Sequence, residues 1–580
     1  MFLPANRRSP RLAQWDGRRR SSRSDAVDWH TLLRRDVLAR LAVVVAACVA
    51  LALLVAGDGP PLPFRVGQTV PRDARARVAF DLVDDPETTQ AREDAERQPA
   101  PGGDPPPQPV VVHSYPAGMV IVRRDEPISP EKLAVLRAEH AAYVRSLSSV
   151  WLGGRRASVF LIVGLLAVTV TAYSIRFQPA LTSSFPSVVG VSALVVVTFA
   201  LADRLNVGPW HVAVIPLTFT AMVLTIAYNP PFALFMSVCL TILMALSQGM
   251  DLTPLLVHLG GLGTAVLAMR EVRTRTRPVE VGLAAGVAFA VMTAAAEVLT
   301  GQTLRFVLID ASRNLIGAVM AGCILTGCLP LIERAFGVVT DVSLLELADN
   351  SHPLLQELIR RAPGTYTHSM TVATLAEGAA EAIGANPLLT RVGCYYHDIG
   401  KMLKPHYFIE NQAGSNAHDQ LGPALSTLVI IGHVKDGVAL AEQYGLPRPV
   451  VDFVRQHHGT TLVEYFYREA LRLHAGEAVP EGLEATFRYP GPKPQSKEGC
   501  ILMLADAAES AGRALTAPTP AALRKLVHEL ATKRLLDGQF DDSGLTLSEL
   551  KAIEDAIAKG LIAVYHVRVR YADAAHVKIA

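Results

Sequence analysis

The sequence predicts a mainly α-helical membrane protein. We expect a multi-span transmembrane helical bundle, a soluble all-α domain after it, and a small extracytoplasmic α/β segment. Half of the 580 residues are hydrophobic, and the mean hydropathy of +0.28 is typical of a chain with several spans. Apolar runs that could cross a bilayer recur up to residue 332. Beyond residue 363 the composition is that of a soluble domain and helical periodicity dominates.

We divide the chain into six parts. They are a basic cytoplasmic tail (1–35), a transmembrane anchor (36–57), a short extracytoplasmic domain (58–155), a seven-helix transmembrane block (156–333), a helical linker (334–362) and a soluble domain (363–580). The anchor, Val37–Ala56, is nearly all Ala, Val and Leu, and is long enough to cross about 30 Å of hydrocarbon. A cleaved signal peptide is the alternative, but the run is longer than a usual signal core and no clear cleavage site follows it.

The extracytoplasmic segment predicts a small α/β module. Val120–Val122 is a candidate strand, and Pro99–Pro109 is a proline-rich linker in extended conformation. A helix is expected to begin at Pro130 with Ser129 as its N-cap. Both a ligand sensor and a passive spacer fit a module of this size.

Seven further apolar runs follow the anchor. They lie at residues 157–175, 187–203, 210–228, 231–248, 253–270, 279–299 and 312–332. Arginines cluster between Arg270 and Arg277 and in the first 40 positions, so the positive-inside rule places that loop and both termini in the cytoplasm. Eight spans satisfy this parity. Since the net charge is only +2, the basic clusters indicate topology, and we expect no nucleic-acid partner.

Isolated polar residues within the spans allow two interpretations. They are His211, His258, Glu297 and Asn314. A carboxylate at membrane depth is a reason to consider a transport pathway. We find no paired acidic and basic residues in the spans, so hydrogen bonding between helices is the preferred interpretation.

The linker predicts two short amphipathic helices. Leucines recur at helical spacing between Val342 and Arg361, and His352-Pro353 interrupts them. Helical patterns then continue to about Leu561, which predicts an all-helical soluble domain.

Histidines and aspartates of the soluble domain predict a metal centre. The candidate ligands are His368, His397, Asp398, His433, His457, His458 and Asp506. Their nitrogen and oxygen donors suit borderline or hard divalent ions. Asp506 lies inside the apolar helix Ile501–Ala508, where an unpaired carboxylate is costly, so a cation is expected beside it. Four other histidines are expected to be ordinary surface or core residues: His352, His406, His418 and His474.

A pair of divalent ions about 3.5–4 Å apart suits the hydrolysis of a phosphodiester. We find no competing nucleophile elbow and no nucleotide-binding Walker motif in the sequence. Lysines near the centre could contact phosphate groups as point charges, namely Lys401, Lys435, Lys493 and Lys497. Tyr395, Tyr396 and Tyr489 could stack on a base, although core packing explains the first two equally well.

The order His…His-Asp…His…His-His…Asp resembles the HD-domain metal-dependent phosphohydrolases. Five motifs narrow the resemblance to the seven-transmembrane HD proteins of the PgpH type. They are YYHDIGK (395–401), FIENQ (408–412), HVKDG (433–437), QHHGTT (456–461) and RYPGPKPQSKE (488–498). Members of that family are bacterial phosphodiesterases that hydrolyse cyclic di-AMP to the linear dinucleotide. The resemblance spans the anchor, the membrane block and the whole C-terminal domain.

The resemblance implies a residue-by-residue assignment. His368, His397, Asp398 and Asp506 would bind one metal ion, and Asp398 would bridge to a second ion held by His433, His457 and His458. Manganese or iron is implied, and the ligand chemistry does not exclude zinc. Asp398 and Lys401 are assigned catalytic roles. Lys435, Lys493 and Tyr396 are assigned to substrate binding.

The family also implies the setting of the enzyme. We expect a multi-pass protein of the bacterial inner membrane with its catalytic domain in the cytoplasm, and partners that are a cyclic dinucleotide, the lipid bilayer and, as an open alternative to a monomer, a second copy of the chain. The extracytoplasmic segment is much shorter than the family's usual domain, which suggests a shortened copy.

Two alternative functions stay open. The first is a phosphodiesterase for another cyclic nucleotide, such as cyclic di-GMP, although the Gly-Tyr-Pro triplet of the common cyclic di-GMP relatives is absent from the expected region. The second is a non-catalytic nucleotide receptor, against which the complete set of metal ligands argues.

Overall fold

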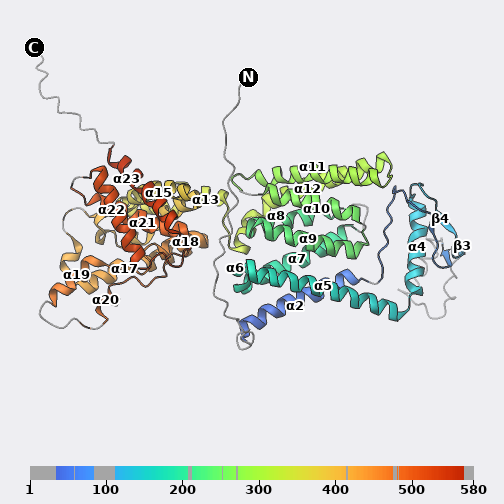
Figure 1. Cartoon of the computed structure of the whole chain (residues 1–580), viewed down its shortest axis with the longest axis horizontal. Coiled ribbons are helices and arrows are strands. Elements are labelled where there is room, and N and C mark those ends of the chain that lie inside the picture. Colours follow the sequence, from blue (N-terminus) through green and yellow to red (C-terminus); the bar gives the residue numbers. More distant parts are fainter. Residues whose placement is uncertain are drawn as a thin grey trace, which may run out of the picture.

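The structure is a computed structural model that describes residues 34–57, 59–83, 111–206, 212–250, 252–269, 272–412, 414, 416–474, 480, 482–516 and 518–566. The expectations for the first 33 residues, for Pro99–Pro109 and for His211 fall outside these ranges. The predicted fold class is confirmed, since helices dominate and the strands are few and short. The molecule is elongated, with the helical bundle between the small α/β module and the soluble domain (Figure 1).

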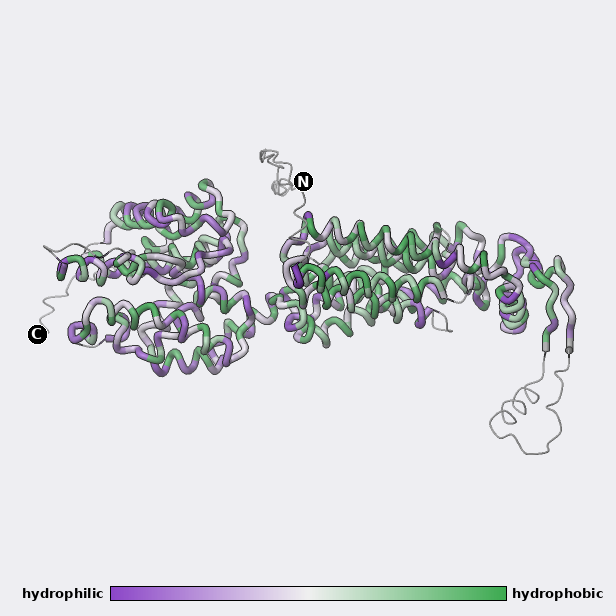
Figure 2. Tube along the Cα trace, turned by 90° about the horizontal axis from the view of Figure 1, so that it is seen from below, coloured by the Kyte–Doolittle hydropathy of each residue, from purple (hydrophilic) through white to green (hydrophobic). Residues whose placement is uncertain are grey.

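The bundle contains a helix for each of the eight predicted apolar runs. These helices are α2 (Arg35–Ala56), α5 (Ser149–Phe177), α7 (Phe185–Asn206), α8 (Val214–Ala227), α9 (Pro230–Gln248), α10 (Leu252–Ala268), α11 (Arg277–Leu299) and α12 (Leu304–Phe336), with the short α6 (Pro179–Ser183) between the second and third. The residues of these helices are hydrophobic along most of their length (Figure 2). On α5, for example, Leu161 is 74% and Val168 is 66% exposed, as expected for side chains that face lipid.

Within the described residues, seven helices are long and apolar enough to cross a membrane, and six of them belong to the bundle, whereas α8 and α10 are shorter. The seventh is α17 (Pro423–Gln443), which packs within the soluble domain against neighbouring helices. Helix α12 begins at Leu304, earlier than the apolar run at 312–332. Its first turns were not predicted because they carry charged residues, and Thr303 caps them by accepting from the Phe306 amide at 3.4 Å.

Helices α11 and α12 pack closely because glycines line their interface. A Cβ added at Gly322 would lie 2.4 Å from the carbonyl oxygen of Pro278. A Cβ at Gly282 would lie 2.6 Å from the carbonyl oxygen of Ala318. Small residues at such contacts let two helix backbones approach each other within a membrane.

Several polar residues of the bundle pair with one another, whereas Glu297 Oε2 and Thr218 Oγ1 are buried without a hydrogen-bond partner. Asn314 donates to Thr293 at 2.8 Å between α12 and α11, which agrees with the interhelical hydrogen bonding that we expected. An ion pair lies just before the last predicted run, where Asp310 of α12 is 3.1 Å from Arg65 and 3.2 Å from Arg313. Asp310 and Arg65 both lie outside the apolar runs, so run length and composition do not predict their contact.

The described part of the α/β module has four short strands and one helix. They are β1 (Ala74–Arg75), β2 (Phe80–Val83), β3 (Val111–Tyr115), β4 (Val120–Val122) and α4 (Pro130–Ser146). Strands β1 and β4 form one antiparallel pair and β2 and β3 form another. Ser129 caps α4 as predicted, accepting from the Lys132 amide at 3.2 Å. Thr69 and Gln302 exchange two hydrogen bonds, at 2.8 and 3.1 Å, and so join the module to the α11–α12 turn.

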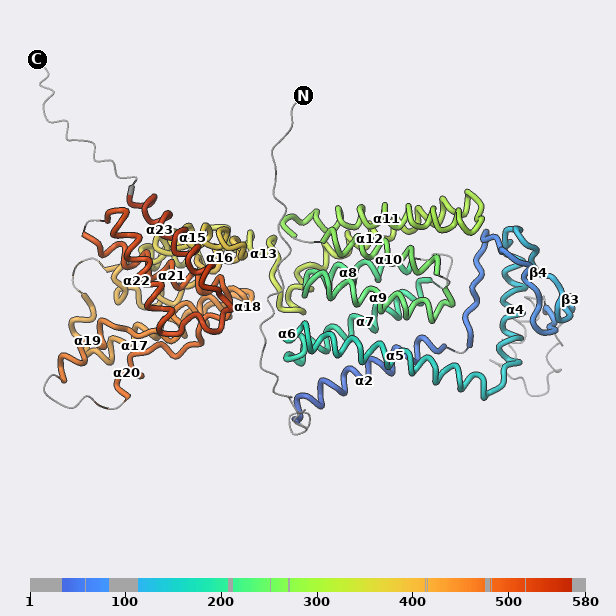
Figure 3. Tube along the Cα trace, in the orientation of Figure 1, coloured from blue at the N-terminus to red at the C-terminus, as the bar shows by residue number. Residues whose placement is uncertain are grey.

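The soluble domain is helical and follows two linker helices. The linker helices are α13 (Asp341–Leu347) and α14 (Pro353–Arg361), separated at His352 as predicted. The domain then contains α15 (Pro363–Ile383), α16 (Pro387–Tyr396), the 3₁₀ turns η1 (Ile399–Leu403), η2 (Pro405–Tyr407), η3 (Ile409–Asn411) and η4 (Ala417–Gln420), and helices α17, α18 (Arg448–Gln456), α19 (Glu464–Leu473), α20 (Leu483–Thr486), α21 (Lys497–Arg513), α22 (Pro520–Leu536) and α23 (Leu547–His566). The chain path from α12 through α13 into this domain can be followed in Figure 3.

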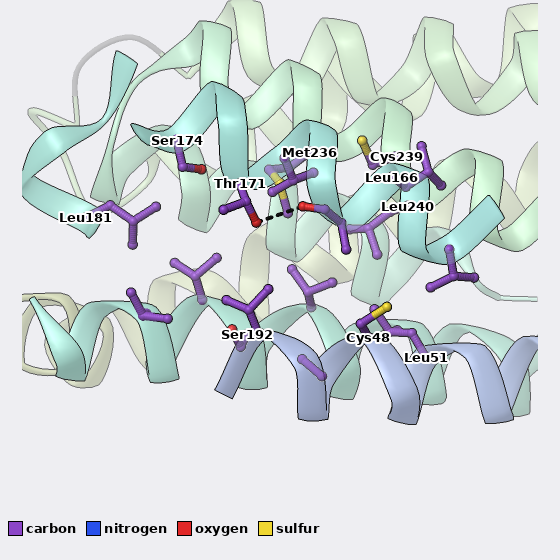
Figure 4. A pocket seen from close by; sticks show the side chains of 18 of the residues that line it. Cys48, Leu51, Leu166, Thr171, Ser174, Leu181, Ser192, Met236, Cys239 and Leu240 are labelled. Carbon is purple, nitrogen blue, oxygen red and sulfur yellow. Dashed lines mark hydrogen bonds between the residues drawn. The ribbon is translucent and has the colours of Figure 1, made fainter. Parts of the chain in front are cut away.

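An apolar cavity of about 150 Å³ lies among α2, α5, α7 and α9 (Figure 4). Leu51, Leu166 and Leu240 are among the residues that line it. The Thr171 hydroxyl beside it donates to the carbonyl of Ala167, one turn earlier on its own helix, at 2.8 Å. Because the lining is apolar and this hydroxyl is satisfied, the cavity offers no arrangement for chemistry.

We predict that Gly322→Ala destabilises the bundle, since its methyl group would meet the carbonyl of Pro278. Gly327→Ala on the same helix is the matched control, because a Cβ there meets nothing within 4 Å. Overpacking of this kind should lower the melting temperature of the full-length protein in detergent by about 2–10 °C, and the control should not. Equal melting temperatures for the two variants, measured by thermal-shift chromatography, would contradict the packing described.

Candidate metal centre

The His397-Asp398 doublet lies where α16 ends and the chain turns into η1. The backbone at Asp398 is no longer helical, with φ −109° and ψ 15°, so its side chain is not constrained to the face of α16. His397 is 0% and Asp398 is 1% exposed. Gly400 follows, and a Cβ there would lie 1.9 Å from the carbonyl oxygen of His433. Only glycine therefore lets η1 approach α17 closely enough to place the doublet beside His433.

The structure brings all seven predicted metal ligands together. They form two groups, of which one is His368, His397, Asp398 and Asp506 and the other is Asp398, His433, His457 and His458. Within each group the ligand atoms lie within 4.8 Å of one another. The residues come from α15, the α16–η1 junction, α17, the end of α18 and α21. Asp398 belongs to both groups.

The two oxygens of the Asp398 carboxylate face different groups. Its Oδ2 lies 3.1 Å from His397 Nε2 and 3.7 Å from His368 Nε2. Its Oδ1 lies 3.3 Å from His433 Nε2 and 3.6 Å from His457 Nε2. This carboxylate is therefore placed to bridge two neighbouring positions.

Backbone carbonyls orient three of the histidines in the same way. The Nδ1 atoms of His397, His433 and His457 lie 2.8, 2.5 and 2.9 Å from the carbonyl oxygens three residues earlier, those of Cys394, Ile430 and Val454. A carbonyl only accepts, so Nδ1 carries the proton and Nε2 presents its lone pair to the centre. Metal-binding histidines are commonly fixed in this manner.

The centre has more buried acceptors than donors. His397 Nε2 and Asp398 Oδ1 are buried without a hydrogen-bond partner. The Nε2 atoms of His433 and His457 lie 3.3 Å apart, although each presents a lone pair. Burying unpaired acceptors is unfavourable, and a divalent cation in each group would satisfy them. The donor set, nitrogen and oxygen without sulfur, fits manganese, iron or zinc.

Glu509 supports the centre and was not predicted. His368 lies between two carboxylates, with Nε2 3.0 Å from Asp506 Oδ1 and Nδ1 2.6 Å from Glu509 Oε2. Burial alone would lower the pKa of His368, but the hydrogen bonds to Asp506 and Glu509 raise it to about 9. Glu509 follows Asp506 by three residues in the same apolar helix, and this spacing was the available signal.

Lys401 lies at the centre and keeps its charge. Its Nζ is 2.7 Å from Asp398 Oδ2 and 3.0 Å from Glu410 Oε1. Burial would lower the pKa of Lys401, but these two carboxylates raise it. Glu410 also accepts from the hydroxyl of Thr365 at 3.0 Å. Glu410 was not predicted as a site residue, although it lies in the FIENQ motif.

The expected stacking of Tyr396 on a base is not supported. Its side chain is 0% exposed, and its hydroxyl donates to the carbonyl of Leu347 in α13 at 2.8 Å. Tyr396 therefore faces the linker helices and not the centre. Tyr489, by contrast, stacks on His458 with ring centroids 4.3 Å apart.

The remaining candidate lysines differ in their surroundings. Lys435 is exposed on α17, and its assignment to substrate binding stays a prediction. Lys497 is 2.5 Å from Glu549. Lys493 is in the loop that follows Tyr489, and its Nζ lies 3.4 Å from Asp541. Lys493 stays a candidate for substrate binding.

We predict that Glu509→Gln weakens metal binding roughly 10- to 100-fold, the range typical of residues that orient a metal ligand. The measurement is a competition titration of manganese into the full-length metal-free protein. Glu381→Gln, an exposed position on the helix that carries His368, is the control and should bind as the wild type does. Identical affinities for the two variants would contradict the role of Glu509.

Metal binding should also release protons. The raised pKa of His368, about 9, means that the metal-free protein holds a proton on this residue at neutral pH. A cation must displace that proton, so metal affinity should rise with pH up to about 9. Calorimetric titration at pH 7 in two buffers of different ionisation enthalpy should give about one more proton released by the wild type than by His368→Asn. An equal count for both proteins would show that His368 does not compete for the proton.

Comparisons with known proteins agree with this architecture. Residues 155–340 match the family model described as "7TM receptor with intracellular HD hydrolase", and residues 365–511 match the HD domain. The cyclic-di-AMP phosphodiesterase PgpH of Listeria monocytogenes is 34% identical over 510 residues, covering 86% of this chain and 69% of that protein. PgpH of Bacillus subtilis is 36% identical over 391 residues, covering 66% of this chain and 53% of that protein.

The chain is also similar to a crystal structure of the L. monocytogenes PgpH HD domain, with 47% sequence identity and a TM-score of 0.35. This match covers 37% of this chain and 100% of the crystallised chain. The identity over most of the chain and the two family matches show the same relationship. The chain therefore belongs to the family of multi-pass membrane HD-domain phosphodiesterases that includes the PgpH proteins, and it is a metal-dependent phosphodiesterase.

Proposed function

We propose that the protein hydrolyses cyclic di-AMP to the linear dinucleotide at a centre of two divalent metal ions. The observation that carries the proposal is the pair of ligand groups that share the Asp398 carboxylate. The substrate is proposed because the relatives from Listeria and Bacillus are named cyclic-di-AMP phosphodiesterases. The shared carboxylate supports two ions side by side, for which we propose manganese or iron.

The proposed centre divides its ligands between the two ions. His368, His397 and Asp506 would complete one site, and His433, His457 and His458 the other. Bound there, divalent cations would activate a water molecule and neutralise charge on the phosphoryl oxygens. Burial lowers the pKa of both His457 and His458, so these side chains stay neutral and able to ligate at physiological pH.

Residues of the chain itself would hold and orient the substrate. We propose that Asp398 and Lys401 are the catalytic pair, since Lys401 brings a positive charge to the same carboxylate that spans both groups. Glu410 fixes the ammonium group of Lys401 from the other side, which positions it for a phosphate oxygen. Tyr489 covers one face of His458 by stacking on it. Lys493, in the loop after Tyr489, is proposed to meet the substrate from the surface.

We propose that the catalytic domain lies on the cytoplasmic side of the bacterial inner membrane. Arg273 lies 3.6 Å from Asp341, and Arg275 pairs with Glu346, so the arginine-rich loop before α11 contacts the first linker helix. The loop and the catalytic domain therefore share one end of the bundle, while the α/β module lies at the other (Figure 1). The positive-inside rule assigns the arginine-rich end to the cytoplasm. The expected homodimer stays a prediction.

The test uses the full-length protein in detergent with manganese. Cyclic di-AMP should be converted to the linear dinucleotide, as identified by mass spectrometry, and cyclic di-GMP and cyclic AMP should be poorer substrates. Asp398→Ala should lose bound metal and reduce turnover by more than about 100-fold, because it removes the ligand common to both groups. Asp555→Ala, an exposed change on α23, is the control.

Two outcomes would contradict the proposal. Faster turnover of another cyclic nucleotide would reassign the substrate. Binding of nucleotide without turnover by metal-loaded wild type would favour a receptor.

A further inference from the structure

Arg534 differs from the other arginines of the catalytic domain. Nine arginines lie within its described residues, of which six contact a carboxylate and two, Arg448 and Arg524, are exposed and unpaired. Arg534 alone is partly buried without a carboxylate at ion-pair distance in the described part of the domain. Its Nε is buried and makes no hydrogen bond. A buried donor without an acceptor is unfavourable, so it suggests a ligand.

The end of α22 places Arg534 beside the metal centre. Gln539, which follows this helix, accepts from the Thr460 amide at 3.0 Å and donates to the Thr460 hydroxyl at 2.8 Å. Thr460 comes two residues after His458. A Cβ at Gly459 would lie 2.3 Å from Gln539 Oε1, so the two segments are in direct contact.

The electrostatic neighbours of Arg534 lead to the same place. They are Asp506 of the metal centre, Glu464, Asp537, and Tyr489, which stacks on His458. Tyr489 in turn interacts electrostatically with Asp398 and Lys401. Lys493 adds a second cation, since its Nζ lies 3.2 Å from the position of a Cβ on Gly538, just beyond α22. Two cationic side chains, Arg534 and Lys493, thus lie near the end of α22, on the Tyr489 side of the centre.

A cyclic dinucleotide needs a second anion site. It has two phosphodiester groups on opposite sides of its ring, and the metal centre can hold only the one that reacts. The other phosphate keeps its negative charge and would otherwise enter a largely buried site without a partner. A guanidinium binds two phosphate oxygens at once and suits this task better than an ammonium.

We propose that Arg534 binds the non-reacting phosphate of the cyclic dinucleotide, with Lys493 beside it, and so selects substrates with two phosphodiester groups. The inference depends on the function proposed above. It makes Arg534 a specificity residue whose contribution is confined to the larger substrate, whereas a residue that only supports the fold would affect every substrate alike.

The experiment compares two substrates with the full-length, manganese-loaded enzyme. For Arg534→Ala, KM for cyclic di-AMP should rise roughly 10- to 100-fold with little change in kcat. The same variant should cleave bis(4-nitrophenyl) phosphate, which has a single phosphodiester, at the wild-type rate. Arg534→Lys should recover part of the loss in KM. Arg524→Ala, exposed and unpaired on the same helix, is the control and should match the wild type on both substrates.

The outcomes separate the inference from the proposed function. Equal losses on both substrates, in Arg534→Ala or, if that variant does not fold, in Arg534→Lys, would overturn the assignment of Arg534. A wild-type KM for cyclic di-AMP in Arg534→Ala would do the same and would leave the proposed function standing. A wild-type enzyme that cleaves bis(4-nitrophenyl) phosphate but not cyclic di-AMP would overturn the proposed function and this inference together.

Discussion

The Asp398 carboxylate is the interaction on which the catalytic domain depends. It is almost fully buried, and four histidine nitrogens lie within 3.7 Å of its two oxygens. A buried carboxylate is stable only if positive charge compensates it. Lys401 supplies one such charge, the protonated His368 supplies another in the metal-free protein, and bound metal would supply the rest. The centre therefore couples the packing of five separate elements to the charge that it holds.

Close backbone contacts make this convergence possible. Gly400 lets η1 lie against the carbonyl of His433. Gly364 lets the start of α15 lie against the backbone of Glu410, since a Cβ at Gly364 would lie 1.9 Å from the Glu410 carbonyl oxygen. The first contact sets the distance between the doublet and α17. The second places the helix of His368 against the residue that holds Lys401. A side chain at either glycine would separate ligands that are sequentially distant.

The membrane block and the metal centre are joined by consecutive polar contacts. Glu333, near the end of α12, accepts from the Thr340 amide at 2.8 Å and from the Ser343 hydroxyl at 2.6 Å, and so fixes the start of α13. The last residue of α13, Leu347, accepts from Tyr396. Tyr396 directly precedes the doublet. The position of the His397-Asp398 doublet relative to α12 thus depends on the hydrogen bond between Tyr396 and Leu347, which lies outside the metal centre.

The sequence alone determined the spans, the helical linker and the identity of the seven candidate ligands, because apolar run length, helical periodicity and ligand chemistry are local properties. It could not identify Glu509 as the partner of His368, 141 positions away, or Asp310 as the partner of Arg65, 245 positions away. Nor could it show that Tyr396 points to the linker or that Arg534 lacks a carboxylate at ion-pair distance. These contacts depend on how helices rotate and pack against each other, which only the tertiary structure decides.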